Sequence, residues 1–132
     1  MSTNAEHYNG LGHLSKIAGQ YEDALGYYDQ AVKLEPSNMD YIYNRGCCYR
    51  LTKSYDEAIK DYDTLISANP SDASALWERG LCCQKLCQYK RAIEYYNRAI
   101  NCNPYHAEYY LWRAISYCGI PDRTNAISDF KA

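Results

Sequence analysis

Cysteine is the residue type of this sequence with the greatest capacity for chemistry. Seven cysteines occur in 132 residues, among them the adjacent pairs Cys47-Cys48 and Cys82-Cys83, and Cys87 lies four residues after the second pair. Thiolates at such spacing would suit a soft metal ion or a redox reaction. No histidine or carboxylate completes a ligand set at a spacing known for zinc. We therefore predict no metal or other cofactor, and interpret the cysteines as small apolar residues in helix contacts.

Arginines recur at a fixed interval and could bind an acidic ligand. Arg45, Arg79 and Arg113 are equally spaced along the chain. They could form a ladder of cations for an acidic peptide, or each guanidinium could pair with carboxylates on neighbouring helices, such as Asp29 and Asp61. Contacts between stacked elements repeat with the period of the elements, whereas contacts with a ligand generally do not. The recurrence therefore favours the structural interpretation.

The overall composition excludes several classes of protein. A formal net charge of -2 gives no basic face for nucleic acid, and no apolar run approaches the roughly 20 residues of a membrane-spanning helix. The first residues carry no secretory signal, and an odd number of cysteines with adjacent pairs makes a poor disulfide framework. We predict a cytoplasmic protein that binds neither nucleic acid nor membranes. Nucleotide-binding loops and metalloprotease motifs are missing from the sequence, so we predict that it is not an enzyme.

An internal repeat with a period of about 34 residues organises the sequence. Pro36, Pro70 and Pro104 are equally spaced, and other residues return at the same interval before each proline. The clearest columns are Tyr21, Tyr55 and Tyr89; Ala24, Ala58, Ala92 and Ala126; Tyr28, Tyr62, Tyr96 and Phe130; and the small residues Gly12, Gly46, Gly80 and Ala114. So many coincident columns at one period indicate a repeat architecture.

Each repeat is predicted to form two helices. In the second repeat, residues 39–52 and 55–68 show the spacing of amphipathic helices, and a short turn joins them. Pro70 ends the second helix, and Ser37-Asn38 and Ser71-Asp72 supply N-cap oxygens for the helices that follow. Glycine costs roughly 1 kcal/mol in a helix interior. We therefore expect the glycine column to lie where the two helices of a hairpin cross at close range.

These columns resemble the tetratricopeptide repeat. The residues that carry the resemblance in the first repeat are Leu11-Gly12, Tyr21, Ala24, Tyr28, Ala31 and Pro36. The resemblance implies an all-α fold, a right-handed superhelical solenoid of antiparallel helix-turn-helix repeats. It predicts a single domain over residues 1–132, with complete repeats at 5–38, 39–72 and 73–106 and a partial repeat at 107–132. The partial repeat departs from the pattern because Arg123 stands in the tyrosine column.

The resemblance further implies that the first helix of each repeat lines a concave groove that binds a peptide or protein segment. The residues that it places in the groove are Asn9, His13, Tyr43, Asn44, Cys47, Arg50, Trp77, Leu81, Gln84, Leu111 and Ile115. Tyrosine and tryptophan are typical anchors of binding sites, so we expect a partly apolar ligand and a role as adaptor or scaffold. The alternative is that Trp77 or Leu111 packs between helices.

Two modes of recognition known in this family do not fit the sequence. The carboxylate clamp grips acidic C-termini of heat-shock chaperones with Lys, Asn and Arg side chains. Only Asn44 matches it, because the other positions hold Asn9, His13, Ser74 and Glu78. An asparagine ladder fails as well, since Asn44 stands alone in its column. We therefore expect no binding of a clamp-type chaperone tail.

An alternative function is assembly. The last predicted helix carries Ile127 and Phe130 with no later repeat in this sequence to cover them, whereas terminal repeats normally have a polar outer face. On this alternative, the chain is a self-assembling structural segment, or a fragment of a larger repeat protein, whose groove packs against its own chain or identical subunits. Self-association through the uncovered C-terminal helix is one form of this alternative, and a fragment of a longer protein is the other.

Overall fold

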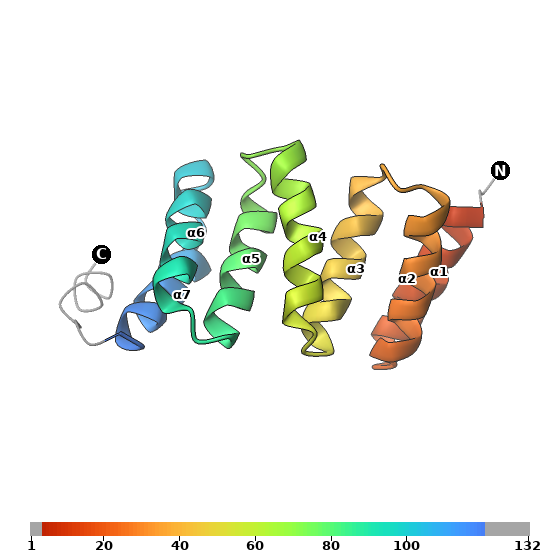
Figure 1. Cartoon of the computed structure of the whole chain (residues 1–132), viewed down its shortest axis with the longest axis horizontal. Helices are drawn as coiled ribbons and strands as arrows, with labels where there is room; N and C mark the ends of the chain where they lie inside the picture. The colour runs from red at the N-terminus through yellow and green to blue at the C-terminus, as the bar shows by residue number, and fades with distance from the viewer. Residues whose placement is uncertain (1–3, 121–132) are drawn as a thin grey trace. The chain divides into compact units, whose positions relative to one another are not determined.

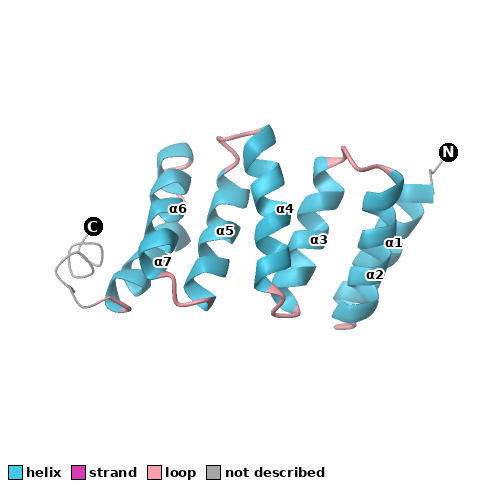
Figure 2. Cartoon of the chain, in the orientation of Figure 1, coloured by secondary structure: helices cyan, strands magenta, loops and turns pink. Residues whose placement is uncertain are grey.

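The computed structural model describes residues 4–120, and within this range it contains helices and turns but no strand (Figure 1). The helices are α1 (Asn4–Ile17), α2 (Tyr21–Leu34), α3 (Met39–Leu51), α4 (Tyr55–Ala68), α5 (Ala73–Lys85), α6 (Tyr89–Cys102) and α7 (Ala107–Cys118). Figure 2 shows that only short loops connect successive helices. The prediction of an all-α fold built from helical hairpins is confirmed. No described helix is long and apolar enough to cross a membrane.

The chain divides into two compact units, Met1–Leu65 and Ile66–Ala132. We call them unit 1 and unit 2 and describe each by itself. The helices α3, α5 and α7 begin at the residues where the sequence places new repeats. A single domain with these repeat boundaries stays a prediction.

Capping residues and turn residues set the ends of the helices. The Oδ1 atoms of Asn38 and Asp72 each accept a hydrogen bond from the backbone N–H three residues later, at 3.3 and 3.1 Å, as predicted. The turn inside each hairpin contains one residue with positive φ: 78° at Gly19, 66° at Lys53 and 60° at Cys87. Glycine adopts this conformation at little steric cost. Lys53 and Cys87 adopt the same positive φ, so the turn has this conformation even where the repeat has no glycine.

Within each hairpin the two helices cross at the small-residue column. A Cβ atom built on Gly12 would lie 2.5 Å from Cε1 of Tyr28, and one on Gly80 would lie 2.5 Å from Cε1 of Tyr96. Side chains do not approach a ring so closely, so these glycines let two fully buried tyrosine rings lie against the first helix. Gly46 meets its own tyrosine ring less closely, at 3.1 Å. The predicted reason for the glycine column is therefore confirmed.

Each unit has its own buried core. In unit 1, Ala24 and Tyr28 of α2 pack against Cys48 of α3, with Leu25 at the edge. Unit 2 contains two clusters, Leu76, Ala99, Ile100 and Tyr109, and Leu81, Cys83, Ala92 and Tyr96. Cys48 thus packs as an apolar residue, which is the interpretation that the sequence favoured. Cys83 also lies in a core cluster, where its sulfur accepts a hydrogen bond from Nη1 of Arg79 at 2.8 Å.

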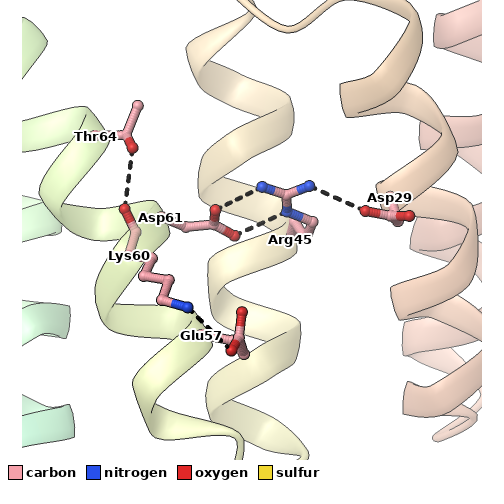
Figure 3. A network of polar contacts seen from close by, with 6 residues as sticks. All are labelled: Asp29, Arg45, Glu57, Lys60, Asp61 and Thr64. Atoms are coloured by element: carbon pink, nitrogen blue, oxygen red, sulfur yellow. Dashed lines mark hydrogen bonds and ion pairs between the residues drawn. The ribbon is translucent and has the colours of Figure 1, made fainter.

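Arg45 connects three helices of unit 1 (Figure 3). Its Nε and Nη2 donate hydrogen bonds to the two carboxylate oxygens of Asp61 on α4, at 2.9 and 2.7 Å, and Nη1 donates to Asp29 on α2 at 3.0 Å. Asp61 is buried, and such bidentate charged pairs are the strong ones. For Arg45, pairing with carboxylates of neighbouring helices is confirmed.

The other two arginines of the column also contact their neighbours in unit 2. Arg113 donates to Oδ1 of Asn97 at 2.8 Å, and Asn97 precedes it by the same 16 residues that separate Asp29 from Arg45. The Arg79 guanidinium lies 4.6 Å from the centre of the Tyr95 ring. An amide and an aromatic ring are thus among the partners of this column, in addition to the carboxylates that bind Arg45.

The second helix that the sequence predicts for the fourth repeat lies outside the described residues. The predictions about Arg123, Ile127 and Phe130, and about an uncovered C-terminal helix, therefore stay predictions.

Gly12→Ala is expected to destabilise unit 1, whereas Gly26→Ala is expected to stabilise it. A methyl group on Gly12 overlaps the Tyr28 ring and should cost about 1–3 kcal/mol. A methyl group on Gly26, inside α2, meets nothing within 4 Å, so the better helix propensity of alanine should add about 1 kcal/mol. Urea unfolding followed by circular dichroism measures both changes. Equal unfolding midpoints for the two variants would contradict the close crossing.

Asp61→Ala is expected to lower the free energy of unfolding by about 2–3 kcal/mol, because it leaves the Arg45 guanidinium with unmet hydrogen bonds in a half-buried place. The matched control is Lys60→Ala on the same helix. Lys60 pairs with Glu57 at 3.4 Å, and their side chains are 73% and 50% exposed (Figure 3), so its loss should change stability by less than about 0.5 kcal/mol. Similar losses for both variants would show that the Arg45 pair adds nothing beyond a surface ion pair.

Candidate functional site

The predicted groove residues lie on the first helices of the hairpins. Unit 1 carries Asn9 and His13 on α1, and Tyr43, Asn44, Cys47 and Arg50 on α3. Unit 2 carries Trp77, Leu81 and Gln84 on α5, and Leu111 and Ile115 on α7. Their role in binding stays a prediction, and their surroundings decide what each could contribute.

A chain of hydrogen bonds joins the polar residues of unit 1. Nδ2 of Asn44 donates to Oδ1 of Asn9 at 3.0 Å, and Nδ2 of Asn9 lies 3.3 Å from Nε2 of His13. Nδ1 of His13 then lies 2.7 Å from the Tyr28 hydroxyl. The chain runs from α3 through α1 to α2, so it fixes the amide groups of both asparagines relative to the hairpin core.

The hydrogen-bond chain also leaves groups available to a ligand. An asparagine amide has two donor hydrogens and two acceptor lone pairs. The chain uses one hydrogen of Asn44 and leaves its carbonyl oxygen with capacity for a ligand.

Burial favours the neutral forms of Tyr28 and Cys48. Burial raises the pKa of Tyr28 to about 12, and it raises the pKa of Cys48 to about 11. A thiol that is protonated at neutral pH is a poor nucleophile and a poor metal ligand. The chemistry that these residues offer is therefore hydrogen bonding between neutral groups.

The remaining groove residues of unit 1 are less exposed than expected. Cys47 is buried, where its sulfur accepts a hydrogen bond from the Tyr62 hydroxyl at 3.4 Å. Cys47 therefore offers little surface to a ligand, and its role in binding stays a prediction. Tyr43 is half-buried with its ring centre 6.3 Å from that of Tyr62, and Arg50 is half-buried.

In unit 2, Gln84 is held by two buried hydroxyl groups. Its Oε1 accepts hydrogen bonds from the Tyr96 hydroxyl and from Oγ of Ser116, both at 2.9 Å. Burial raises the pKa of Tyr96 well above its ordinary value, so this hydroxyl stays a donor. Both lone pairs of the Gln84 oxygen are occupied, and its half-buried amide keeps two N–H donors for a ligand. No sequence pattern points directly to this network, since its three members occupy different columns.

Trp77 and Leu81 pack mainly inside unit 2. Leu81 is buried in a core cluster and offers little surface to a ligand. Trp77 is half-buried, and its ring centre lies 5.8 Å from Tyr109 and 6.1 Å from His106. The latter two rings stack on each other at 4.2 Å. For Trp77, packing between helices, the alternative left open above, describes the structure better than an exposed anchor does.

Leu111 and Ile115 form the exposed apolar part of the predicted set. They are 48% and 36% exposed and lie four residues apart on α7, so they share one helix face. Ser116, which follows Ile115 in the chain, is the residue that bonds Gln84. The exposed side chains of Leu111 and Ile115 are therefore close in sequence to Ser116, whose hydrogen bond helps to orient the amide N–H donors of Gln84.

The shallow surface hollows found in the described residues lie elsewhere. One is lined by residues 87–91 and Ile120, another by Tyr8 and residues of α2, and a third by residues 35–38. None of these three includes a predicted groove residue. These three hollows therefore give no support for a small-molecule site at the predicted groove residues.

Comparisons with known proteins agree with this architecture. "MamA 41-end from Desulfovibrio magneticus RS-1" has a TM-score of 0.92 and 24% identity, over 96% of this chain and 72% of that chain. The crystal structure of MamA protein has a TM-score of 0.91 and 25% identity, over 97% and 70%. The first TPR of Spaghetti (RPAP3), bound to the HSP90 peptide SRMEEVD, has a TM-score of 0.85 and 21% identity, over 92% and 97%. No curated protein sequence matches the chain significantly.

The family model for the tetratricopeptide repeat matches residues 18–64 and 54–107, which together cover more than half of the chain. The fold of this family is typical of modules for protein–protein interaction. The chain therefore belongs to the tetratricopeptide repeat family.

Proposed function

We propose that this protein is a non-enzymatic adaptor or scaffold that binds an extended, partly apolar peptide on the first helices of its repeats. The observation that carries the proposal is the combination in unit 2 of the exposed pair Leu111 and Ile115 with the fixed amide of Gln84. Exposed apolar side chains mark interaction sites. Oriented N–H donors match the backbone carbonyl groups that every extended peptide presents.

The polar residues of unit 1 support the same kind of ligand. The amides of Asn9 and Asn44 are held in place by their mutual hydrogen bond and by His13. Groups that are already oriented lose little conformational entropy when a ligand binds. The two asparagine amides would suit the polar backbone or a neutral side chain of the peptide, because an amide carries no charge.

An acidic C-terminal tail is not the expected ligand. The RPAP3 repeat domain was solved with the HSP90 peptide SRMEEVD. In this chain the positions that carry cations in clamp-type family members hold Asn9, Ser74 and Glu78, none of which is a cation. A carboxylate that leaves water needs a charged partner to offset its desolvation.

We also propose a cytoplasmic location. It is supported by Cys48, Cys82 and Cys83, which are buried thiols rather than halves of disulfides, since thiols stay reduced in a reducing compartment.

The double variant Leu111→Ser/Ile115→Ser is expected to lose peptide binding about tenfold or more, because contact with each aliphatic side chain contributes on the order of 1 kcal/mol. Peptides are first selected with the native protein from a random library, and affinities are measured by fluorescence anisotropy. Selected peptides should carry two apolar side chains, and SRMEEVD should bind no better than its scrambled sequence.

The matched control is Tyr105→Ser, because Tyr105 is 94% exposed in the same unit and outside the predicted surface. It should leave affinity unchanged. Circular dichroism checks that all variants are folded. Equal affinity of the double variant and the native protein would refute the proposed surface, and tight binding of SRMEEVD would refute the proposed ligand chemistry.

A further inference from the structure

An exposed carboxylate lies beside the apolar pair of the proposed peptide site. Glu108 is in the first turn of α7 and is exposed, and in the described part of the chain its side chain has neither an ion pair nor a hydrogen bond. Leu111 follows it by three residues and Ile115 by seven, so the three side chains share one helix face. Residues three apart on a helix are neighbours, with about 5–6 Å between their Cβ atoms. A ligand that covers Leu111 therefore also meets the Glu108 carboxylate.

Further carboxylates lie near the same end of α7. Burial raises the pKa of Tyr109, and the carboxylates of Asp72, Glu108 and Glu78 are among the groups that raise it further. All three carboxylates therefore act through space on the Tyr109 hydroxyl. The Tyr109 ring is buried, and its centre lies 5.8 Å from that of Trp77 on α5. The contact between α5 and the first turn of α7 thus has a negative electrostatic potential.

The cations of α5 and α7 are directed away from this negative end. Arg113 donates a hydrogen bond to Asn97 of α6 at 2.8 Å, and the Arg79 guanidinium lies 4.6 Å from the centre of the Tyr95 ring, also on α6. Lys85 is in the last turn of α5, at the opposite end of that helix from its N-cap. In the described structure, no cation of α5 or α7 therefore compensates the charge of Glu108.

An aromatic ring lies one turn away from the same carboxylate. Trp112 follows Glu108 by four residues and is half-buried, so part of its side chain is open to a ligand. The face of an aromatic ring attracts cations. Unit 2 already contains such a contact, since the Arg113 guanidinium lies 5.3 Å from the centre of the Tyr110 ring. A carboxylate with a tryptophan one turn away suits the side chain of a lysine or an arginine.

We propose that the peptide ligand carries a lysine or arginine beside its two apolar side chains, and that this cation binds the Glu108 carboxylate while the apolar side chains contact Leu111 and Ile115. The inference rests on the proposed function, because it assigns a charge to the ligand of the same surface. An ion pair at the rim of an apolar contact adds specificity for the partner. The partner class is therefore a basic, partly apolar peptide.

The helix dipole gives Glu108 a second role, because a carboxylate in the first turn of a helix stabilises that helix. This contribution is present in the free and in the bound protein alike. It changes the free energy of unfolding and leaves the affinity for a charged peptide unaffected. Measurements of affinity therefore separate recognition of a cation from stabilisation of α7.

Peptides selected by the native protein from a random library test the proposal, with affinities measured by fluorescence anisotropy. The selected peptides should contain a lysine or arginine. Glu108→Gln should bind them about fivefold more weakly, which is the upper range for loss of a partly exposed ion pair. The matched control is Glu94→Gln, because Glu94 is an exposed carboxylate of the same unit that lies on α6. This variant should bind like the native protein, and circular dichroism checks that both variants are folded.

Reversal of both charges tests the contact directly. Replacement of the basic residue of a selected peptide by glutamate should weaken binding to the native protein about tenfold or more, because two carboxylates then face each other. Glu108→Lys should bind the original peptide weakly for the same reason. Glu108→Lys should bind the glutamate peptide about fivefold or more tightly than the native protein does. Added salt should weaken the native complex more than the Glu108→Gln complex.

Two results would overturn the inference while leaving the proposed function intact. The first is a set of selected peptides that depend on Leu111 and Ile115 but contain no basic residue. The second is equal affinity of the native protein and Glu108→Gln for a basic peptide, with no recovery in the charge reversal. Failure of the proposed function looks different, because the variant Leu111→Ser/Ile115→Ser would then bind the selected peptides like the native protein, and the inference would fall with it.

Discussion

The close crossing of two helices inside each hairpin is the constraint on which the rest of the structure depends. Gly12 and Gly80 allow the rings of Tyr28 and Tyr96 to approach a helix backbone to distances that no Cβ atom would permit. These rings then place their hydroxyl groups at the first helix, where they bond His13 and Gln84. The same packing that forms the core therefore orients the polar groups of the candidate binding surface.

Residues of one column occupy equivalent backbone positions in each repeat, and the neighbouring helices determine whether each of them is buried or exposed. Cys48 and Ser116 are buried because another helix covers them, while Leu14 in the same column is exposed. The column of His13 shows a similar range, since Cys47 and Leu81 are buried and Ile115 is exposed. Peptide binding is proposed where residues of an apolar column are exposed, so the proposed function uses the same columns that stabilise the fold.

Much of this architecture could be predicted from the sequence, because the constant period of the repeat defines equivalent positions. The helices, the capping residues Asn38 and Asp72, and the glycine crossing all follow from local chemistry that repeats. Burial of individual groove residues could not be predicted in the same way. Whether Trp77 packs inward depends on the rings of His106 and Tyr109, and the bond between Gln84 and Ser116 joins residues 32 positions apart. These contacts depend on side chains that differ between repeats, so periodicity carries no information about them.

The central claim is that peptide binding uses the exposed aliphatic residues of unit 2, Leu111 and Ile115. Methyl NMR spectra, recorded while a library-selected peptide is titrated into Leu- and Ile-labelled protein, test this claim most directly. We predict large shift changes for Leu111 and Ile115 and none for Leu14, Ile17 or the fully buried Leu76. Changes concentrated at Leu14 and Ile17, with Leu111 and Ile115 unchanged, would contradict the account.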